Sequence, residues 1–181
     1  PSARSGGAWT AIGTDTSAPY SVNWNTSALN GDFDLHVVTT DTAGNAHSSA
    51  VVTVTVDNTA PSAPVISLSE SSPYAHVSGQ TIFVNTGQSG SYDVSATSSD
   101  AQSGIEKIRF PGPTDDSSSP YGTSYGFGDL SGSQTVTSFN NAGLSASDTF
   151  TVTPDTTAPF TTDDTGTIGS AWRNAPVTVS L

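Results

Sequence analysis

A short motif that occurs twice, about one small domain apart, constrains the fold of this chain most strongly. Val-Thr-Val-Asp-Asn-Thr-Ala-Pro at 54–61 returns as Val-Thr-Pro-Asp-Thr-Thr-Ala-Pro at 152–159, with the two aspartates 98 residues apart. Two fainter pairs, Pro-Tyr and Ala-Gly, recur in the same order at offsets of 101 and 99 residues. Self-similarity at a fixed period indicates a chain built from repeated structural units.

The period also predicts the size and the boundaries of the units. About a hundred residues is the length of one immunoglobulin-like sandwich, and Asp-x-Thr-Ala-Pro is typical of a short, stiff linker. We therefore expect the C-terminal part of one module in residues 1–57 and a complete module in residues 58–155. Residues 156–181 should form the N-terminal part of a further module.

Composition favours strands and turns over helices. Of 181 residues, 17 are glycine and 11 are proline, and only 33% are hydrophobic, so an all-β fold with thin cores is expected. Alternation of apolar and polar residues predicts that Tyr92, Val94 and Ala96, with Phe150 and Val152, face the core. Trp24 is also a core candidate. The expected strands are 9–12, 20–24, 33–38, 52–56, 65–68, 81–84, 92–96, 105–110, 125–130, 134–139 and 149–153.

Charge and hydropathy exclude several functions. The formal net charge is −12, with 16 acidic residues against four basic ones, so a phosphate backbone would be repelled and nucleic-acid binding is excluded. No apolar run approaches the ~20 residues that a membrane span requires. The N-terminus has no signal-peptide pattern, so any export signal is expected outside this segment. The absence of cysteine rules out disulfides and thiolate zinc sites.

Several motifs together resemble the bacterial immunoglobulin-like repeats of large extracellular proteins. They are the stretch 9–24, Asn-Gly-Asp-Phe-Asp-Leu at 30–35, Thr-Asp-Thr-Ala-Gly-Asn at 40–45, the linkers at 56–61 and 155–159, and Asp-Ala-Gln-Ser-Gly-Ile at 100–105. The resemblance implies strings of modules in secreted or cell-surface adhesins, cell-wall proteins or hydrolases. In this family a corner tyrosine is common where Phe33 stands, so its hydrogen bond to the backbone should be missing here.

Catalytic constellations are weak, and we expect no enzyme activity and no catalytic or cofactor-binding residue. Gly-Thr-Ser-Tyr-Gly at 122–126 fits a nucleophile motif that needs a following helix, which this sequence does not predict. Such a match arises by chance in a chain rich in glycine and serine. His36, His47 and His76 lack the spacing of a metal site or of an oriented base.

Acidic and amide side chains do gather beside the first linker in the expected sandwich. The loops 98–104 and 140–148 should lie at the same pole as residues 57 and 58, together with Asn140 and Asn141. Calcium takes 6 to 8 oxygen ligands in irregular geometry, so a calcium ion could stiffen this junction. Alternatively, these residues only form turns. The predicted ligands are Asp57, Asn58, Asp100, Asp32 and Asp148.

We expect a non-catalytic spacer or an adhesive stalk whose partners are neighbouring modules of the same chain. A surface glycan or a protein ligand is a further expected partner. The alternative is a carbohydrate-binding or accessory module of an extracellular hydrolase. A module that lacks its first strands exposes sheet edges, so head-to-tail self-association between copies is a further hypothesis. The aromatic residues considered for sugar stacking are Trp9, Trp24, Trp172, Tyr20, Tyr121 and Tyr125.

Overall fold

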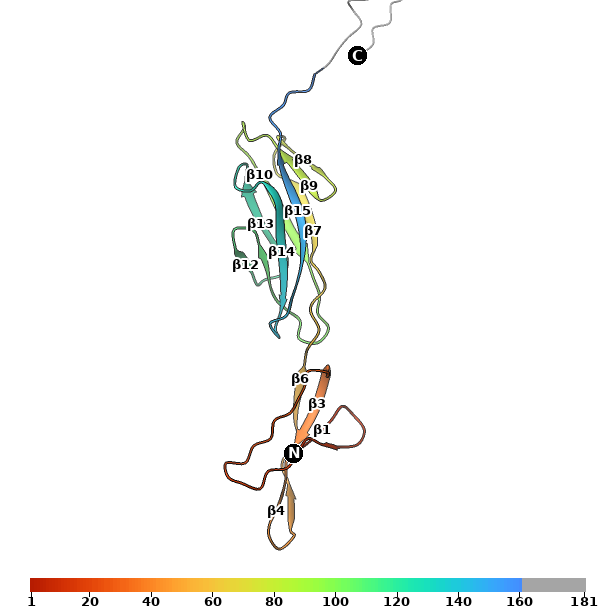
Figure 1. The fold of residues 1–181 in the computed structure, drawn as a ribbon. Coiled ribbons are helices and arrows are strands. Elements are labelled where there is room, and N and C mark those ends of the chain that lie inside the picture. Colours follow the sequence, from red (N-terminus) through yellow and green to blue (C-terminus); the bar gives the residue numbers. More distant parts are fainter. Residues whose placement is uncertain (161–181) are drawn as a thin grey trace, which may run out of the picture.

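The computed structural model describes residues 1–160, and every regular element in this range is a strand. The strands form two units that lie end to end and are joined by residues 57–61 (Figure 1). The expected all-β class is therefore confirmed. No helix in residues 1–160 is long and apolar enough to cross a membrane.

The N-terminal unit, comprising residues 1–56, is one open sheet with a separate hairpin. Its sheet has the order β2-β1-β3-β6, and all neighbouring strands are antiparallel. The hairpin pairs β4 with β5. The strands are β1 (Ser2–Arg4), β2 (Thr10–Ala11), β3 (Gly31–His36), β4 (Val38–Thr40), β5 (Ala46–Ser48) and β6 (Val52–Val56).

The second unit, here called the sandwich, contains a three-stranded sheet of order β13-β10-β7 and a six-stranded sheet of order β12-β11-β14-β15-β9-β8. Only β15 and β9 pair in parallel. The strands are β7 (Val65–Glu70), β8 (Ala75–Ser78), β9 (Thr81–Val84), β10 (Ser91–Thr97), β11 (Ile105–Phe110), β12 (Thr114–Asp116), β13 (Tyr121–Gly126), β14 (Gly132–Asn140) and β15 (Ser145–Pro154).

One hydrophobic cluster joins the two sheets of the sandwich. The three-stranded sheet contributes Tyr92, Val94 and Ala96, and the six-stranded sheet contributes Phe150 and Val152. All five are buried, so the inward-facing residues predicted from alternation are confirmed. Such residues alternate with outward-facing ones along each strand, so the side chains of the two inner faces meet in one core between the sheets.

Four strands of the N-terminal unit are arranged like four strands of the sandwich. The order β2-β1-β3-β6 matches β12-β11-β14-β15, and β6 and β15 both lead into a copy of the Asp-x-Thr-Ala-Pro motif. Residues 1–56 contain no counterparts of β7 to β10. The strand predicted at 20–24 is not formed. Its counterpart in the sandwich, β13, pairs only with β10, and residues 1–56 contain no counterpart of β10 with which residues 20–24 could pair.

Two tyrosines in the sandwich core differ in how their hydroxyl groups are satisfied. The rings of Tyr92 and Tyr125 lie 5.8 Å apart, and burial raises the pKa of each to about 12. The Tyr125 hydroxyl donates to the carbonyl oxygen of Pro111 at 2.8 Å. The hydroxyl of Tyr92 is buried without a hydrogen-bond partner in the described part of the chain.

Phenylalanine substitutions should therefore act in opposite directions. Tyr125→Phe should lower the free energy of unfolding by about 1 kcal/mol, because it leaves the carbonyl of Pro111 without its donor. Tyr92→Phe should leave it unchanged or raise it by up to about 1 kcal/mol, because it removes an unsatisfied buried polar group. Urea unfolding of both variants measures the difference. A larger loss in Tyr92→Phe than in Tyr125→Phe would mean that the Tyr92 hydroxyl has a partner.

Candidate functional site at the junction between the two units

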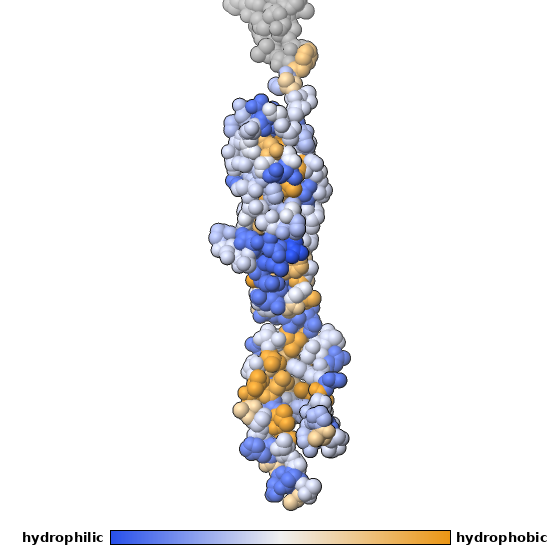
Figure 2. Space-filling view, turned by 90° about the vertical axis from the view of Figure 1, so that its left-hand side faces the viewer, coloured by the Kyte–Doolittle hydropathy of each residue, from blue (hydrophilic) through white to orange (hydrophobic). Residues whose placement is uncertain are grey.

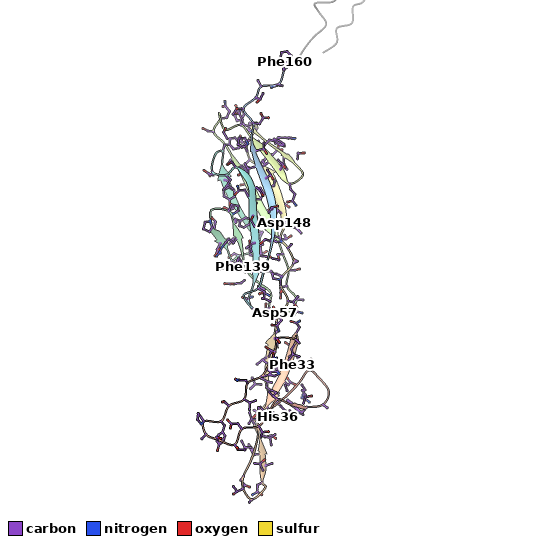
Figure 3. The ribbon with its side chains drawn as sticks, in the orientation of Figure 1. Phe33, His36, Asp57, Phe139, Asp148 and Phe160 are labelled. Carbon is purple, nitrogen blue, oxygen red and sulfur yellow. The ribbon has the colours of Figure 1, made fainter. Side chains whose placement is uncertain are left out.

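Two adjacent residues of the linker are held by opposite units. The backbone N–H of Asn58 donates to Oδ1 of Asn30 at 2.7 Å, and its side-chain amide donates to the carbonyl oxygens of Thr26 and Leu29, both at 2.8 Å. All three acceptors belong to the N-terminal unit. Asp57, which lies at the junction in Figure 3, instead accepts from the side-chain amide of Asn140 in the sandwich. The linker is thus anchored on both sides within two residues.

Asn140, the last residue of β14, is the centre of the contacts on the sandwich side. Its side chain is fully buried, and its amide nitrogen lies 2.9 Å from Oδ2 of Asp57, 3.0 Å from the carbonyl oxygen of Thr59 and 3.1 Å from Oδ2 of Asp100. Oδ1 of Asn140 accepts from the N–H of Leu144 at 2.8 Å. This bond fixes the orientation of the amide, so its donor side faces both carboxylates.

Asp100 is held in its loop by backbone donors. Its Oδ1 accepts from the N–H groups of Gln102, Ser103 and Gly104 at 3.0, 2.8 and 3.2 Å. Ser103 also donates its hydroxyl to Oδ2 of Asp57, which ties the loop to the linker. Burial raises the pKa of Asp100, but the bonds from Ser103, Asn140 and the neighbouring N–H groups outweigh it, so the pKa is lowered overall.

Acid should therefore weaken the junction. A carboxyl whose pKa is lowered on folding stabilises the folded state at every pH above its ordinary pKa of 3.8. This stabilisation is lost as the pH falls through the lowered pKa. Melting temperatures of the chain should be level above about pH 5 and should fall below about pH 4. Asp100→Asn should show a shallower fall in the same series of thermal melts. If the melting temperature fell identically in the variant and the parent, protonation of Asp100 would not be a cause of the loss of stability in acid.

The remainder of the linker lies on the sandwich. Oδ1 of Asp57 accepts from the N–H of Thr59 at 3.0 Å, which forms a local turn, and Pro61 is buried. Ser62 donates its N–H to the carbonyl oxygen of Ser99 at 2.9 Å. Its own carbonyl oxygen accepts from the hydroxyl of Ser138 at 3.0 Å. Hydrogen bonds therefore hold both ends of this segment, at residues 57–59 and at Ser62.

The structure brings together some of the predicted site residues and separates others. Asp57 and Asp100 meet at Asn140 as expected, whereas the side chain of Asn58 faces the N-terminal unit. Asp32 lies on β3 and accepts from the hydroxyl of Thr55, its cross-strand neighbour, at 2.6 Å. It is not part of the cluster around Asn140.

The expectation that Asp148 lies at the junction is wrong. Asp148 is opposite Val136 in the β14–β15 ladder, partway along the sandwich (Figure 3). The prediction assumed a loop over 140–148, but the chain turns between Asn140 and Leu144, where Gly143 has φ +83°. Strand β15 therefore begins at Ser145, and Asp148 falls inside it.

Hydrogen-bond donors, rather than cations, face the carboxylates at the junction. In residues 1–160 no group of three or more His, Asp or Glu side chains could hold a metal ion. The ion pairs of the same range involve Arg4, His76, Lys107 and Arg109, and none of them includes Asp57 or Asp100. Calcium binding at this junction stays a prediction, which titration calorimetry tests.

The aromatic residues considered for sugar stacking are largely used in packing. The ring of Trp9 stacks on His36 with centroids 3.8 Å apart, and the Arg4 guanidinium lies 4.4 Å from the same ring. Trp24 packs edge-on against Phe33 at 5.3 Å. Tyr125 is buried and Tyr20 is exposed, while Trp172 lies outside the described residues. Carbohydrate binding stays a prediction, which a glycan array tests.

The nucleophile-like motif at 122–126 does not have the required context. Ser124 lies within β13, an edge strand of the three-stranded sheet, and its hydroxyl donates to the carboxylate of Asp93. The motif needs a sharp turn from a strand into a helix, and no helix follows Ser124 in the part of the chain that the structure describes.

No family model matches the chain, and no curated protein does. Two similar solved structures are the fibronectin(III)-like modules of Clostridium thermocellum CbhA and the SGBP-B protein of a Bacteroides ovatus mixed-linkage glucan utilization locus, in complex with a mixed-linkage heptasaccharide. The first is 20% identical over 84% of this chain and 77% of that chain, with a TM-score of 0.42. The second is 21% identical over 84% of this chain and 38% of that chain, with a TM-score of 0.23. Likenesses this distant indicate no function.

Proposed function

We propose that this chain is a stiff, non-catalytic spacer of a secreted or cell-surface protein, in which consecutive units keep a fixed relative orientation. The observation that carries the proposal is that the adjacent residues Asp57 and Asn58 are bonded to different units. Asn58 is bonded to the N-terminal unit and Asp57 to the sandwich. Because they are adjacent, few backbone torsions remain free between the two anchor points.

The sequence and contacts of the linker support this role. Residues 57–64 contain no glycine, and both prolines in this range, Pro61 and Pro64, are buried. A proline has a fixed φ and little conformational freedom to lose, so this segment costs less to hold in one conformation than a flexible linker would. The two units follow one another along a common long axis, as a spacer requires (Figure 1).

The bonds at the junction are also of a kind that tolerates changes in salt. Asn140, Ser103 and Asn58 are neutral donors, so the contacts depend less on screening than ion pairs between exposed charges would. A spacer outside the cell meets variable ionic strength. We expect its geometry to be the same in dilute buffer and at high salt.

The absence of cysteine from the chain allows a direct test. Thr10→Cys and Ser133→Cys place one spin label on an exposed position of each unit. Electron-electron double resonance should give a single narrow distance distribution between the two labels at low and at high salt. A broad distribution would refute the fixed orientation and, with it, the proposed function.

A further inference from the structure

Strand β13 lies at the edge of the three-stranded sheet, and among the described residues it pairs only with β10. In an antiparallel ladder the backbone groups of alternate residues point to one neighbour, and those of the residues between point to the other side. The N–H groups of Gly122 and Gly126 are bonded to side chains outside this sheet. Gly122, Ser124 and Gly126 therefore present their backbone groups outward, and such a row is a template for a further strand.

Two aspartates occupy the ends of this outward row. Oδ2 of Asp116, the last residue of β12, accepts from the N–H of Gly122 at 2.9 Å. Oδ2 of Asp129 accepts from the N–H of Gly126 at 2.7 Å, and the N–H of Asp129 donates to the carbonyl oxygen of Gly126 at 3.2 Å. Gly126 is thus bonded on its outer side as it would be by a residue of a neighbouring strand.

The loop that carries Asp116 recurs in the N-terminal unit. Asp116 accepts from the backbone N–H groups two and six residues further along the chain, at 3.0 and 2.9 Å. Asp15 accepts from N–H groups at the same separations, both at 2.9 Å, although residues 20–24 form no strand. The loop therefore makes these bonds without needing the sheet. The bonds, that of Ser118 first, lower the pKa of the Asp116 carboxyl, so its bond to the strand is charge-assisted.

The side chains of β13 themselves give the edge no protection. Natural proteins block such edges with charged side chains, prolines or bulges, whereas β13 reads Tyr-Gly-Thr-Ser-Tyr-Gly. The side on which β12 and β13 lie in Figure 1 faces the viewer in Figure 2, where the surface of the sandwich is mainly hydrophilic or neutral. Attraction at this edge must therefore come from backbone groups, and these are the groups that the two aspartates occupy.

We propose that Asp116 and Asp129 keep the edge of β13 closed to a second copy of the chain. When their carboxylates are removed, the β13 strands of two copies pair antiparallel about Ser124. The two three-stranded sheets then form one continuous sheet, as in other cases of strand addition. Because the same edge is used by both copies, the contact is isologous and closes as a dimer.

The sequence of β13 fits this pairing. With Ser124 opposite its equivalent, Gly122 lies opposite Gly126 of the second copy, and Thr123 lies opposite Tyr125 of the second copy. The glycines exchange the outward backbone groups that the aspartates hold in the single chain. Pairs of an aromatic with a β-branched residue are favourable across strands, and β13 brings no like charges together.

Sedimentation equilibrium of the full chain with two double substitutions tests the proposal. Asp116→Ala with Asp129→Ala removes both acceptors, whereas Asp116→Asn with Asp129→Asn removes the same charges and keeps an oxygen that accepts from each N–H. The alanine pair should associate at least about a hundredfold more tightly than the parent, because two charge-assisted bonds no longer have to be broken. Its mass should level off at twice the 18.3 kDa of one chain. The asparagine pair should associate like the parent.

Hydrogen exchange of the Ser124 amide shows whether this edge forms the contact. The amide should become protected as the concentration of the alanine pair rises, and it should not in the parent or the asparagine pair. The Val94 amide in β10 reports whether the sandwich is folded. If the alanine pair loses protection there, Asp116→Ala and Asp129→Ala are used singly, and each should associate about tenfold more tightly than the parent.

Two results would overturn the proposal. One is equal association of the alanine variants and the asparagine pair, which would mean that the aspartates act only through their charge or not at all. The other is association that leaves exchange of the Ser124 amide as fast as in the single chain, which would place the contact elsewhere.

Discussion

Replacing Asn140 with alanine is expected to lower the free energy of unfolding of the sandwich by about 3 kcal/mol. The side chain is fully buried and takes part in hydrogen bonds with Asp57, Thr59, Asp100 and Leu144. Without it, the carboxylates of Asp57 and Asp100 lose the donor they share, and a buried cavity remains. Breaking such a network costs more than a single hydrogen bond, because each partner is left only partly satisfied.

Hydrogen exchange of the Val94 amide in the core strand β10 measures this loss within the sandwich itself. The neighbouring residue provides the control. Asn141 is exposed and donates to the carbonyl oxygen of Ser103 at 2.8 Å, so Asn141→Ala should cost about 1 kcal/mol or less. If the two variants lost equal stability, Asn140 would not be the centre of the junction.

Replacing Asn58 with alanine should loosen the linker with little effect on the stability of the sandwich. The substitution removes the side-chain bonds to the carbonyl oxygens of Thr26 and Leu29 and leaves the contacts of Asp57 intact. Two hydrogen bonds contribute about 2 kcal/mol together. Their loss should raise the population in which the N-terminal unit swings away by about thirtyfold.

The spin-labelled pair described above should then give a visibly broader distance distribution. Asn45→Ala is the matched control, because Asn45 is also an exposed asparagine and its side chain bonds only Asp41, within the β4–β5 hairpin. The spin-label distance distribution of Asn45→Ala should equal that of the parent. An unchanged distribution in Asn58→Ala would mean that the linker is held by other contacts.

Strands rich in β-branched and aromatic residues could be predicted closely from the sequence. The ranges 52–56, 81–84 and 105–110 were expected with the bounds that the structure shows. The short edge strands β8 and β12 were missed. Thr-Asp-Asp in β12 has no apolar residue to reveal its pairing with β11, and the Arg109 guanidinium of β11, which donates to Asp115 at 2.6 and 2.9 Å, gives no alternating pattern either. Residues 20–24 have a strand pattern but lack the neighbour that would hold them.

The residues of the candidate site could be predicted only in part from the sequence. Linker and loop aspartates could be placed at one pole because a sandwich brings the same ends of its strands together. The roles of Ser62, Ser103 and Ser138 could not be foreseen, because serine is frequent along the whole chain. Nor does the sequence show which side of the Asn140 amide faces the carboxylates, since the N–H of Leu144 decides this in the folded chain.

Nitrogen-15 relaxation of the backbone amides tests the central claim most directly. If the Asp57 and Asn58 contacts hold the two units as one body, amides of β3 and β14 should fit a single elongated tumbling tensor. Its long axis should run along both units. Separate and shorter correlation times for the N-terminal unit and the sandwich would contradict the account, because they would show that the linker leaves each unit free to reorient.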